Sequence, residues 1–431
     1  SLSPSMLKRS LEEWLAEIEA RHPSEIDLGL ERISLVWELL KQEIPPSRSV
    51  TPVNITVAGT NGKGSCVAAM QALLVQHGYS VGAFTSPHFL HYSERIRIDG
   101  VSVSDQELVA AFELIEVVRS ETSLTYFEFN ALAALVIFRR ADLDAVLLEV
   151  GLGGRLDAVN IIDADVTILS SVDLDHQDWL GDTRALIARE KLGVARQGKP
   201  LLVGETDLPD GFYETVRSIG ASALYYDADF SIDNGGDSSQ FSVNLKTNTG
   251  TLLIPDITHG NLLPVNISLA LQALVSAGFV INARTCLEAL KCLSLPGRQQ
   301  RVKFQGVDLL LDVAHNPAAA RVLAAKIPII KGTTYAVASV LNDKDWAGIV
   351  AEIHPSVDVW LLGKITDNHR AMETQRLVEV VYNSGAEAVC FESVELAFDR
   401  AVQLTSPGDQ VVVFGSFHTV SAVLTIISKE G

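Results

Sequence analysis

The sequence is poor in cysteine and has no long apolar run. Its four cysteines, Cys66, Cys286, Cys292 and Cys390, form no CxxC pair and have no histidine cluster beside them. That spacing excludes a zinc-finger site and a disulfide framework. No uninterrupted apolar segment reaches the roughly 18 residues that span a bilayer, and no signal-peptide pattern occurs. We therefore expect a protein of the reducing cytoplasm.

Positive charge is also scarce. There are 34 lysines and arginines against 53 acidic residues, a formal net charge of −19, and no basic run interrupts this excess. Because phosphate backbones and anionic lipids attract basic surfaces, we expect no nucleic acid and no membrane as partner. Nor does the sequence show an interface signal, so monomer is the default expectation. Any anionic ligand must be held by a local group of hydrogen-bond donors or positive charges, because the net charge of the chain is negative.

The first half of the chain alternates short apolar runs with longer amphipathic stretches. Two helices are expected before this pattern begins, at residues 7–19 and 30–41. Apolar runs bounded by turn residues then predict strands, and the first is followed by a helix at 65–76; the strands are 53–58, 81–85, 145–150 and 166–171. Such runs suit central strands of a parallel sheet covered by helices. The fold class is therefore α/β, with an N-terminal P-loop-type doubly wound domain.

A second strand–helix series follows an irregular region. Residues 227–248 predict a hairpin-bearing excursion with a mobile tip at 234–239, and helices follow at 264–277 and 284–293. After the Leu295-Pro296-Gly297 linker, strands are expected at 307–312, 334–340, 357–362, 388–391 and 410–414, with helices at 318–326, 346–354, 373–384, 394–405 and 419–428. This pattern predicts a smaller C-terminal Rossmann-like α/β domain at 297–431, after a first domain at 1–296.

A glycine-rich loop joins the strand at 53–58 to the helix at 65–76. It reads Gly59-Thr60-Asn61-Gly62-Lys63-Gly64-Ser65. Its glycines let backbone amides turn toward phosphate oxygens, and the following helix adds its positive end. Lys63 would reach the terminal phosphates, and Ser65 could orient phosphate or a metal. Gly64 separates Lys63 from Ser65, so the loop departs from the strict P-loop string, yet it predicts phosphate binding.

Polar residues follow the neighbouring strands. Glu149 ends an apolar strand, His176 follows the strand at 166–171, and Ser86 follows the strand at 81–85. Ligands of doubly wound sheets bind at these carboxyl ends, so a Mg²⁺ site near the phosphates is expected, although imidazole is an unusual ligand for Mg²⁺. The alternatives are a Glu149–Arg155 ion pair, a structural histidine and an ordinary Ser-Pro turn.

Further candidates lie on a later helix, in the linker and in the second domain. Lys191 is either functional or a solvated helix lysine. Asp312 and His315 close the first strand of the second domain and are candidates for nucleotide recognition, with capping by Asn316 as the alternative. Arg298 either reaches a ligand or forms a surface ion pair.

Together these strings resemble the Mur-ligase-like family of ATP-dependent amide ligases, and more narrowly its bifunctional dihydrofolate synthase/folylpolyglutamate synthase branch. The resemblance covers nearly the whole chain. It rests on the phosphate loop and on residues 27–32, 85–88, 94–95, 123–128, 149–157, 174–176, 180–181, 189–191, 295–298, 312–317 and 415–420. One departure is Ala158, where relatives usually carry threonine.

The resemblance implies specific site residues. Its ATP site maps onto Thr60, Asn61, Gly62 and Lys63 of the phosphate loop, together with Asn266, Arg298 and Asp312. Its Mg²⁺ ligands map onto Ser86, Glu149 and His176. Lys191 matches a lysine that relatives carry as a carbamate, so Lys63, Lys191 and His176 are the catalytic candidates. The implied dihydropteroate pocket comprises Asp27, Leu28, Gly29, Leu124, Thr125, Tyr126, Phe127, Arg155, Leu156 and Asp157.

The implied reaction adds L-glutamate to dihydropteroate and to reduced folates at the expense of ATP, through an acyl phosphate. Two alternatives stay open. One is another Mur-like amide ligase, which the strings at 27–32 and 123–127 disfavour. The other is a nucleotide-gated switch protein that hydrolyses ATP without joining anything, and phosphate release independent of glutamate and pteroate would be its sign.

Overall fold

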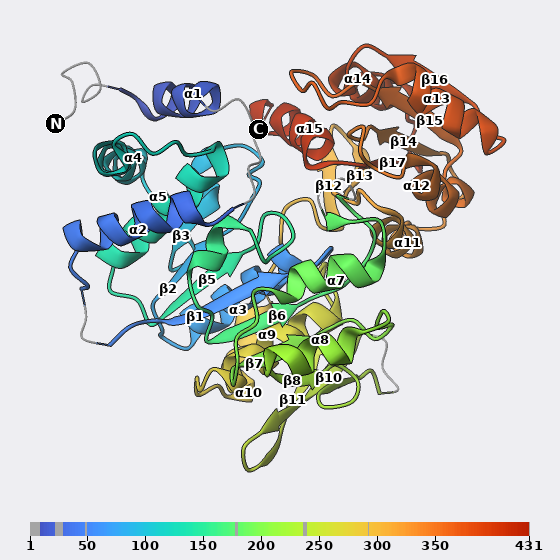
Figure 1. Cartoon of the computed structure of the whole chain (residues 1–431). Coiled ribbons are helices and arrows are strands. Elements are labelled where there is room, and N and C mark those ends of the chain that lie inside the picture. The colour runs from blue at the N-terminus through green and yellow to red at the C-terminus, as the bar shows by residue number, and fades with distance from the viewer. Residues whose placement is uncertain are drawn as a thin grey trace. The chain divides into compact units, whose positions relative to one another are not determined.

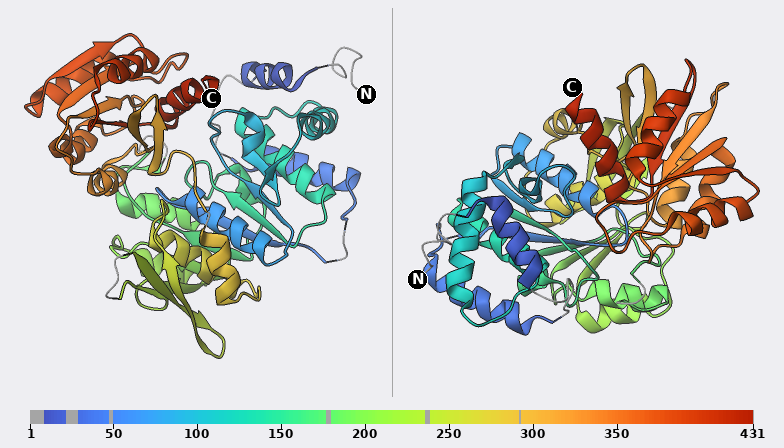
Figure 2. Two further views of the ribbon diagram at one scale, coloured as in Figure 1. Left: turned by 180° about the vertical axis from the view of Figure 1, so that it is seen from behind. Right: turned by 90° about the horizontal axis from the view of Figure 1, so that it is seen from above.

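The computed structural model of the chain describes residues 9–21, 29–47, 50–176, 180–235, 239–291 and 293–430. Their contacts divide them into two compact units, each of which is coherent in Figures 1 and 2. The first unit comprises the described residues of Ser1–His88, Tyr92–Val172 and Gln177–Leu293. The second comprises those of Phe89–His91, Asp173–His176 and Ser294–Gly431. The domain division at 296/297 stays a prediction.

The first unit is built on an eight-stranded mixed sheet. The strand order is β4-β3-β2-β5-β1-β6-β7-β8. The bounds are β1 Val53–Ala58, β2 Val81–Phe84, β3 Ile96–Ile98, β4 Val101–Ser102, β5 Ala145–Glu149, β6 Val166–Leu169, β7 Pro200–Val203 and β8 Ser222–Tyr225. Six strands are parallel, whereas β3 and β4 pair antiparallel at one edge. The α/β class is confirmed, with an antiparallel edge that the apolar runs do not predict.

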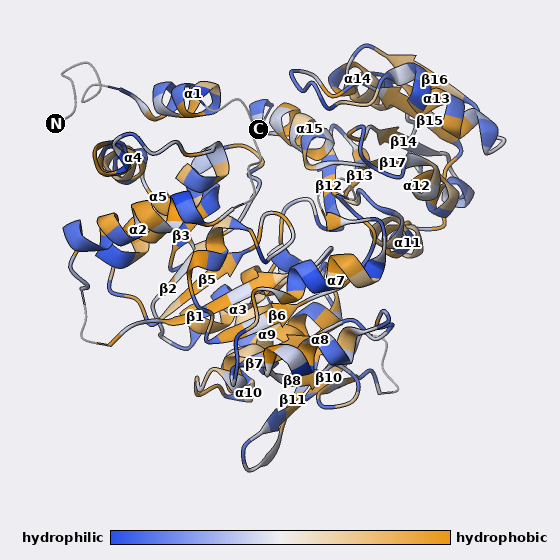
Figure 3. Ribbon diagram, viewed as in Figure 1, coloured by the Kyte–Doolittle hydropathy of each residue, from blue (hydrophilic) through white to orange (hydrophobic). Residues whose placement is uncertain are grey.

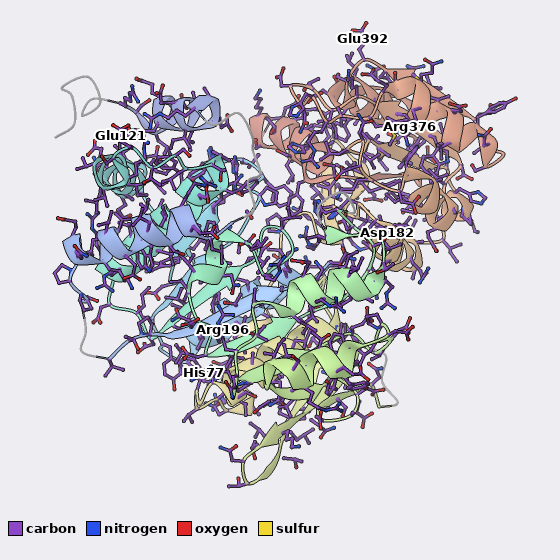
Figure 4. The ribbon with its side chains drawn as sticks, in the orientation of Figure 1. His77, Glu121, Asp182, Arg196, Arg376 and Glu392 are labelled. Carbon is purple, nitrogen blue, oxygen red and sulfur yellow. The ribbon has the colours of Figure 1, made fainter. Side chains whose placement is uncertain are left out.

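Helices cover this sheet. They are α1 Leu11–Arg21, α2 Glu31–Glu43, α3 Lys63–Gln76, α4 Asp105–Arg119, α5 Tyr126–Arg140, α7 Arg184–Leu192, α8 Phe212–Ile219, α9 Pro264–Ser276 and α10 Ala283–Lys291, with short 3₁₀ turns η2 Tyr92–Arg95 and η3 Ala158–Ile161. Helix α3 packs against α9 and α10, while α4 packs against α1, α2 and α5. At the far end of α3, His77 Nε2 accepts a hydrogen bond from the Asn282 amide before α10 (3.1 Å; Figure 4 labels His77).

The excursion predicted at 227–248 is a separate antiparallel sheet. Its strands are β9 Ser231–Asp233, β10 Gln240–Thr247 and β11 Gly250–Thr258, in the order β11-β10-β9. Val243 and Leu245 on β10 are buried, as the alternating pattern of this strand requires. The predicted tip falls partly on residues 236–238, which lie outside the described part of the chain.

The second unit is a six-stranded sheet with helices. Its order is β12-β13-β17-β14-β15-β16, and only the β12–β13 pair is antiparallel among these strands. The strands are β12 Gln300–Phe304, β13 Val307–Leu311, β14 Thr334–Ala338, β15 Val359–Gly363, β16 Ala388–Phe391 and β17 Gln410–Phe414. The helices are α11 Pro317–Lys326, α12 Trp346–Ile353, α13 Thr374–Asn383, α14 Val394–Leu404 and α15 Phe417–Lys429, with a 3₁₀ turn η4 at His354–Ser356. The predicted strands and helices of this half are all present.

Apolar side chains hold the layers together. Hydrophobic residues run along β1 and α9 in Figure 3, and Ile55, Val57 and Leu269 are fully buried. Burying such surface is the main favourable term in folding. Across the described residues, no helix is both long enough and apolar enough to cross a bilayer.

Candidate active site

The glycine-rich loop leads from β1 into the first turn of α3. Helix α3 begins at Lys63, two residues earlier than expected, because Gly62 precedes it in a left-handed conformation (φ 90°). Amides in a first helical turn have no intrahelical acceptor and carry the positive end of the helix dipole. The loop therefore presents amide donors together with Lys63, as an anion site requires.

Close packing holds the loop in shape. The amide of Thr60 donates to the Ser171 carbonyl (3.0 Å), and the amide of Asn61 donates to Ser171 Oγ (2.9 Å). A Cβ at Gly59 would lie 1.9 Å from Ser170 Oγ, and one at Gly62 would lie 2.7 Å from Asn266 Oδ1. The structure thus brings Asn266, on α9, against the loop with which sequence analysis grouped it.

The charge of Lys63 acts on the 151–157 loop. Lys63 Nζ donates to the Gly59 carbonyl (2.9 Å). Burial raises the pKa of Asp157 above its ordinary value, and the amides of Leu152, Val159 and Gly151 oppose that shift, as does the charge of Lys63. This electrostatic contact joins the predicted phosphate loop to a residue of the predicted pteroate pocket.

Two oxygen donors stand at the ends of neighbouring strands. Glu149 is the last residue of β5 and is 7% exposed, and Ser86 follows β2, whose Phe84 pairs with Leu148. Burial raises the pKa of the Cys66 thiol, and the charge of Glu149 adds to that effect, so the carboxylate acts close to the start of α3. A carboxylate and a hydroxyl suit a hard divalent cation. Glu149 does not pair with Arg155, whose guanidinium binds Glu190 (3.1 Å).

His176 belongs by its contacts to the second unit. Its Nδ1 lies 3.8 Å from Asp343 Oδ2, and its backbone is left-handed (φ 49°). Ser86 and Glu149 belong to the first unit, so the three predicted metal ligands do not fall in one compact unit. Among the described residues no group of three or more His, Cys, Asp or Glu side chains is arranged to hold a metal. The metal set stays a prediction.

Beside His176 lies a charged cluster that sequence reasoning did not assemble. Asp175 Oδ1 lies 2.6 Å from Lys344 Nζ, and Asp175 Oδ2 lies 3.3 Å from His315 Nε2. Burial alone would raise the pKa of Asp175, but the hydrogen bond and charge of His315 and the charge of Lys344 hold it well below its ordinary value. The polar run Asn342-Asp343-Lys344, in the connection between β14 and α12, is the signal that would have pointed to Lys344.

The predicted pteroate pocket is partly described. Asp27 and Leu28 lie outside the described residues, whereas Gly29 precedes α2. Leu124 and Thr125 are buried, and Phe127 is 40% exposed. Arg32, early in α2, donates to the Ser123 carbonyl (2.8 Å) and to Glu128 Oε1 (2.9 Å). These bonds tie the start of α2 to the two residues that flank 124–127.

The third segment, Arg155 to Asp157, packs on the end of α7. The amide of Arg155 donates to the Glu190 carbonyl (2.8 Å), and a Cβ at Gly154 would lie 2.8 Å from the Lys191 carbonyl. Arg196, which Figure 4 labels, donates a hydrogen bond to Asn160 Oδ1 (2.8 Å). Lys191 itself is 4% exposed, so the solvated-lysine alternative is wrong.

In the second unit, the predicted nucleotide residues lie around the end of β13 and the linker. Asp312 accepts from the amides of Gln299 (2.9 Å) and Ala314 (2.8 Å). Burial raises the pKa of Asp312, and the charge of Arg298 opposes the shift. The Arg298 guanidinium lies 4.9 Å from the Phe417 ring centre. Asn316 caps α11 through the Ala319 amide (2.9 Å), so the capping alternative holds for that residue.

Known proteins match this chain along almost its entire length. Residues 297–417 match the family model described as the Mur ligase, glutamate ligase domain. The dihydrofolate synthase/folylpolyglutamate synthase of Escherichia coli K12 is 38% identical over 424 residues, covering 97% of this chain and 96% of the relative.

Solved structures agree in fold. Escherichia coli FolC in complex with DHPP and ADP superposes with a TM-score of 0.90 at 37% identity, covering 98% of this chain and 99% of that one. A bifunctional folylpolyglutamate synthase/dihydrofolate synthase with Mn, AMPPNP and L-glutamate bound gives 0.87 at 39% identity, covering 98% of both chains. With identity and coverage at this level, the chain belongs to the dihydrofolate synthase/folylpolyglutamate synthase family of ATP-dependent, Mur-type glutamate ligases.

Proposed function

We propose that this chain joins the amine of L-glutamate to the carboxylate of dihydropteroate, forming dihydrofolate, and to the terminal carboxylate of reduced folates, forming folylpolyglutamates. The observation that carries the proposal is the similarity of almost the whole chain to dihydrofolate synthase/folylpolyglutamate synthases. The charge of Lys63 acts on Asp157, which supports a phosphate loop near the segment proposed for the pteroate pocket. One relative is solved with DHPP and ADP, another with AMPPNP and L-glutamate.

The first step activates the acid. A carboxylate is a poor electrophile at neutral pH, so one of its oxygens takes the γ-phosphoryl group of ATP, giving an acyl phosphate and ADP. Charge builds on the transferring oxygens, and fixed donors aimed at such charge are usually the largest catalytic contribution. We assign this role to Lys63 and to the amides at the start of α3. Thr60, Asn61, Gly62, Gly64 and Ser65 complete this part of the nucleotide site, with Asn266 against it.

Ser86 and Glu149, together with His176, are the residues proposed to hold Mg²⁺. The oxygen donors of Ser86 and Glu149 fit a hard cation, and a relative is solved with Mn. When bound, the ion neutralises phosphate charge. Lys191 is proposed to carry a carbamate, which would replace the positive charge of this buried side chain with a negative one.

In the second step, the amine of glutamate attacks the acyl carbon and inorganic phosphate leaves. The match of residues 297–417 to a glutamate ligase domain supports a second domain at 297–431 that takes part in this step. There, Arg298, Asp312 and His315 are proposed to bind the nucleotide. The substrate pocket is proposed to comprise Asp27–Gly29, Leu124–Phe127 and Arg155–Asp157. The cytoplasmic location and the monomeric state stay predictions, and light scattering on the purified chain tests the latter.

The test is amide formation followed by mass spectrometry. The chain is mixed with ATP, Mg²⁺ and glutamate, and dihydropteroate or a reduced monoglutamyl folate is added in separate tubes. Product in both tubes is expected. Product with the folate alone would reduce the chain to a chain-extending synthase. ATP turnover without product in either tube would leave the switch protein as the better description.

A further inference from the structure

Arg95 is a buried arginine next to the predicted phosphoryl-transfer site. It ends the 3₁₀ turn η2, immediately before β3, and is 6% exposed. Its carbonyl accepts a hydrogen bond from the amide of Thr85 (2.9 Å), the residue before Ser86. The backbone therefore fixes Arg95 beside the carboxyl end of β2, within the first unit.

The charge of Arg95 has no carboxylate partner among the described residues. Its Nε donates to Nδ1 of His88 (2.8 Å), and its Nη1 is buried without a hydrogen-bond partner in the described part of the chain. Two other partly buried arginines of this unit have acidic partners: Arg32 pairs with Glu128 and Arg119 pairs with Glu116. A buried cation that is neither paired nor fully hydrogen-bonded is costly, which points to an anion that completes it.

Two tyrosines surround the guanidinium with neutral groups. Its Cζ lies 5.4 Å from the Tyr92 ring centre and 5.6 Å from the Tyr126 ring centre. Burial raises the pKa of both phenols, with the charge of Arg95 opposing, so neither supplies a negative charge at neutral pH. The ring faces hold the guanidinium and leave its N–H edge as the group that can bind a ligand.

We propose that Arg95 binds the substrate carboxylate that becomes phosphorylated. This proposal rests on the proposed function and names the group that recognises its acid substrate. Tyr126 belongs to the segment matched to the pteroate pocket, and Ser86 to the proposed metal ligands. Arg95 therefore lies between the two, where that carboxylate has to be. Planar guanidinium and planar carboxylate form paired hydrogen bonds, which also fix the carboxylate plane.

The phosphates of ATP are a less suitable ligand for Arg95. The phosphate loop follows β1, and β5 lies between β1 and β2 in the sheet. The loop also has its own lysine, Lys63. Strand β5 thus separates an arginine beside β2 from the loop, and the guanidinium of Arg95 lies near Tyr126.

The experiment compares two ligands that differ by the carboxylate alone. Binding of dihydropteroate and of its decarboxylated analogue, 6-(anilinomethyl)-7,8-dihydropterin, is measured by calorimetry with ADP present. The unmodified chain is expected to prefer the acid, and Arg95→Met is expected to lower that preference by about 10- to 100-fold while affinity for the analogue stays unchanged. Arg95→Lys keeps the charge but loses the paired N–H donors of the guanidinium, so an intermediate preference for the acid is expected. If the methionine variant does not fold, the lysine variant tests the proposal.

Arg119→Met is the matched control, because Arg119 already pairs with Glu116. The Arg119→Met variant should prefer the acid as strongly as the unmodified chain does. An unchanged preference in both Arg95 variants would overturn the assignment, as would an effect confined to the KM of glutamate. Failure of the proposed function looks different: the unmodified chain would then form no amide and would show no preference for the acid.

Discussion

At the scale of single residues, Lys63 offers the most direct test of the nucleotide site. Removing its ammonium group, which now binds the Gly59 carbonyl, takes away the charged donor that we propose for the phosphates. We expect Lys63→Ala to lower kcat by about 100-fold or more, since loss of one such donor typically does so. Steady-state amide formation measures this. Lys199→Ala is the control, because Lys199 is half exposed and lies 3.8 Å from Asp165; equal loss in both variants would contradict the assignment.

Lys191 carries a chemical prediction of its own. Its burial makes a bare ammonium group costly, and a carbamate would change its charge. With ¹³C-labelled bicarbonate, the folded chain should show a carbamate resonance that disappears in Lys191→Ala, together with most of the activity. The Lys199→Ala chain should keep the resonance. If the unmodified chain takes up no label, Lys191 acts as an amine or only as a packing residue.

Sequence reasoning placed individual residues best where the chain itself enforces proximity. The phosphate loop is contiguous, so its members had to lie together. Asp175 and Lys344 are far apart in sequence, and only the fold brings their side chains to 2.6 Å. Arg95 stood out as part of a motif, but its missing carboxylate partner is a property of packing that no spacing reveals. Asp27 and Leu28 lie outside the described residues, so their place stays predicted.

At the scale of elements, the β1–α3 turn depends on glycine. Gly62 has a left-handed backbone and a Cβ there would meet Asn266 Oδ1 at 2.7 Å. Gly62→Ala should therefore cost about 1–3 kcal/mol of folding free energy and weaken ADP binding. Denaturant unfolding and calorimetry measure the two effects.

Gly198→Ala is the control that separates the effect of backbone strain from the effect of a clash with Asn266. Gly198 also has positive φ (+71°), but a Cβ there would meet nothing within 4 Å. Its substitution should cost stability through backbone strain and leave ADP affinity unchanged. If both variants bind ADP as tightly as the unmodified chain, the turn is not the phosphate site.

Long apolar strands and amphipathic helices were predictable because their periodicity persists over many residues. The strands β1, β16 and β17 have the predicted bounds. Strands β3 and β4 are too short to show a period. Strand β12 was not predicted, because it is polar on one side, as its exposed Arg301 and Lys303 show. It pairs antiparallel at an edge, where a polar face is tolerated.

At the scale of the whole molecule, the proposed nucleotide contacts come from both units. Lys63 belongs to the first unit and Arg298 to the second. Arg298→Ala should raise the KM for ATP by about tenfold, because a charge-assisted contact is lost. Arg321→Ala is the control in the same unit, since Arg321 is exposed and pairs with Glu352 (3.0 Å). Unchanged KM in Arg298→Ala would confine the nucleotide site to the first unit.

The central claim is that an acid is activated by phosphorylation and then joined to glutamate. Dihydropteroate labelled with ¹⁸O in both carboxylate oxygens tests it most directly, with ATP, Mg²⁺ and glutamate present. The account predicts one labelled oxygen in the released inorganic phosphate for each amide formed, and the other retained in the amide carbonyl. Unlabelled phosphate, or phosphate released without amide, would contradict it.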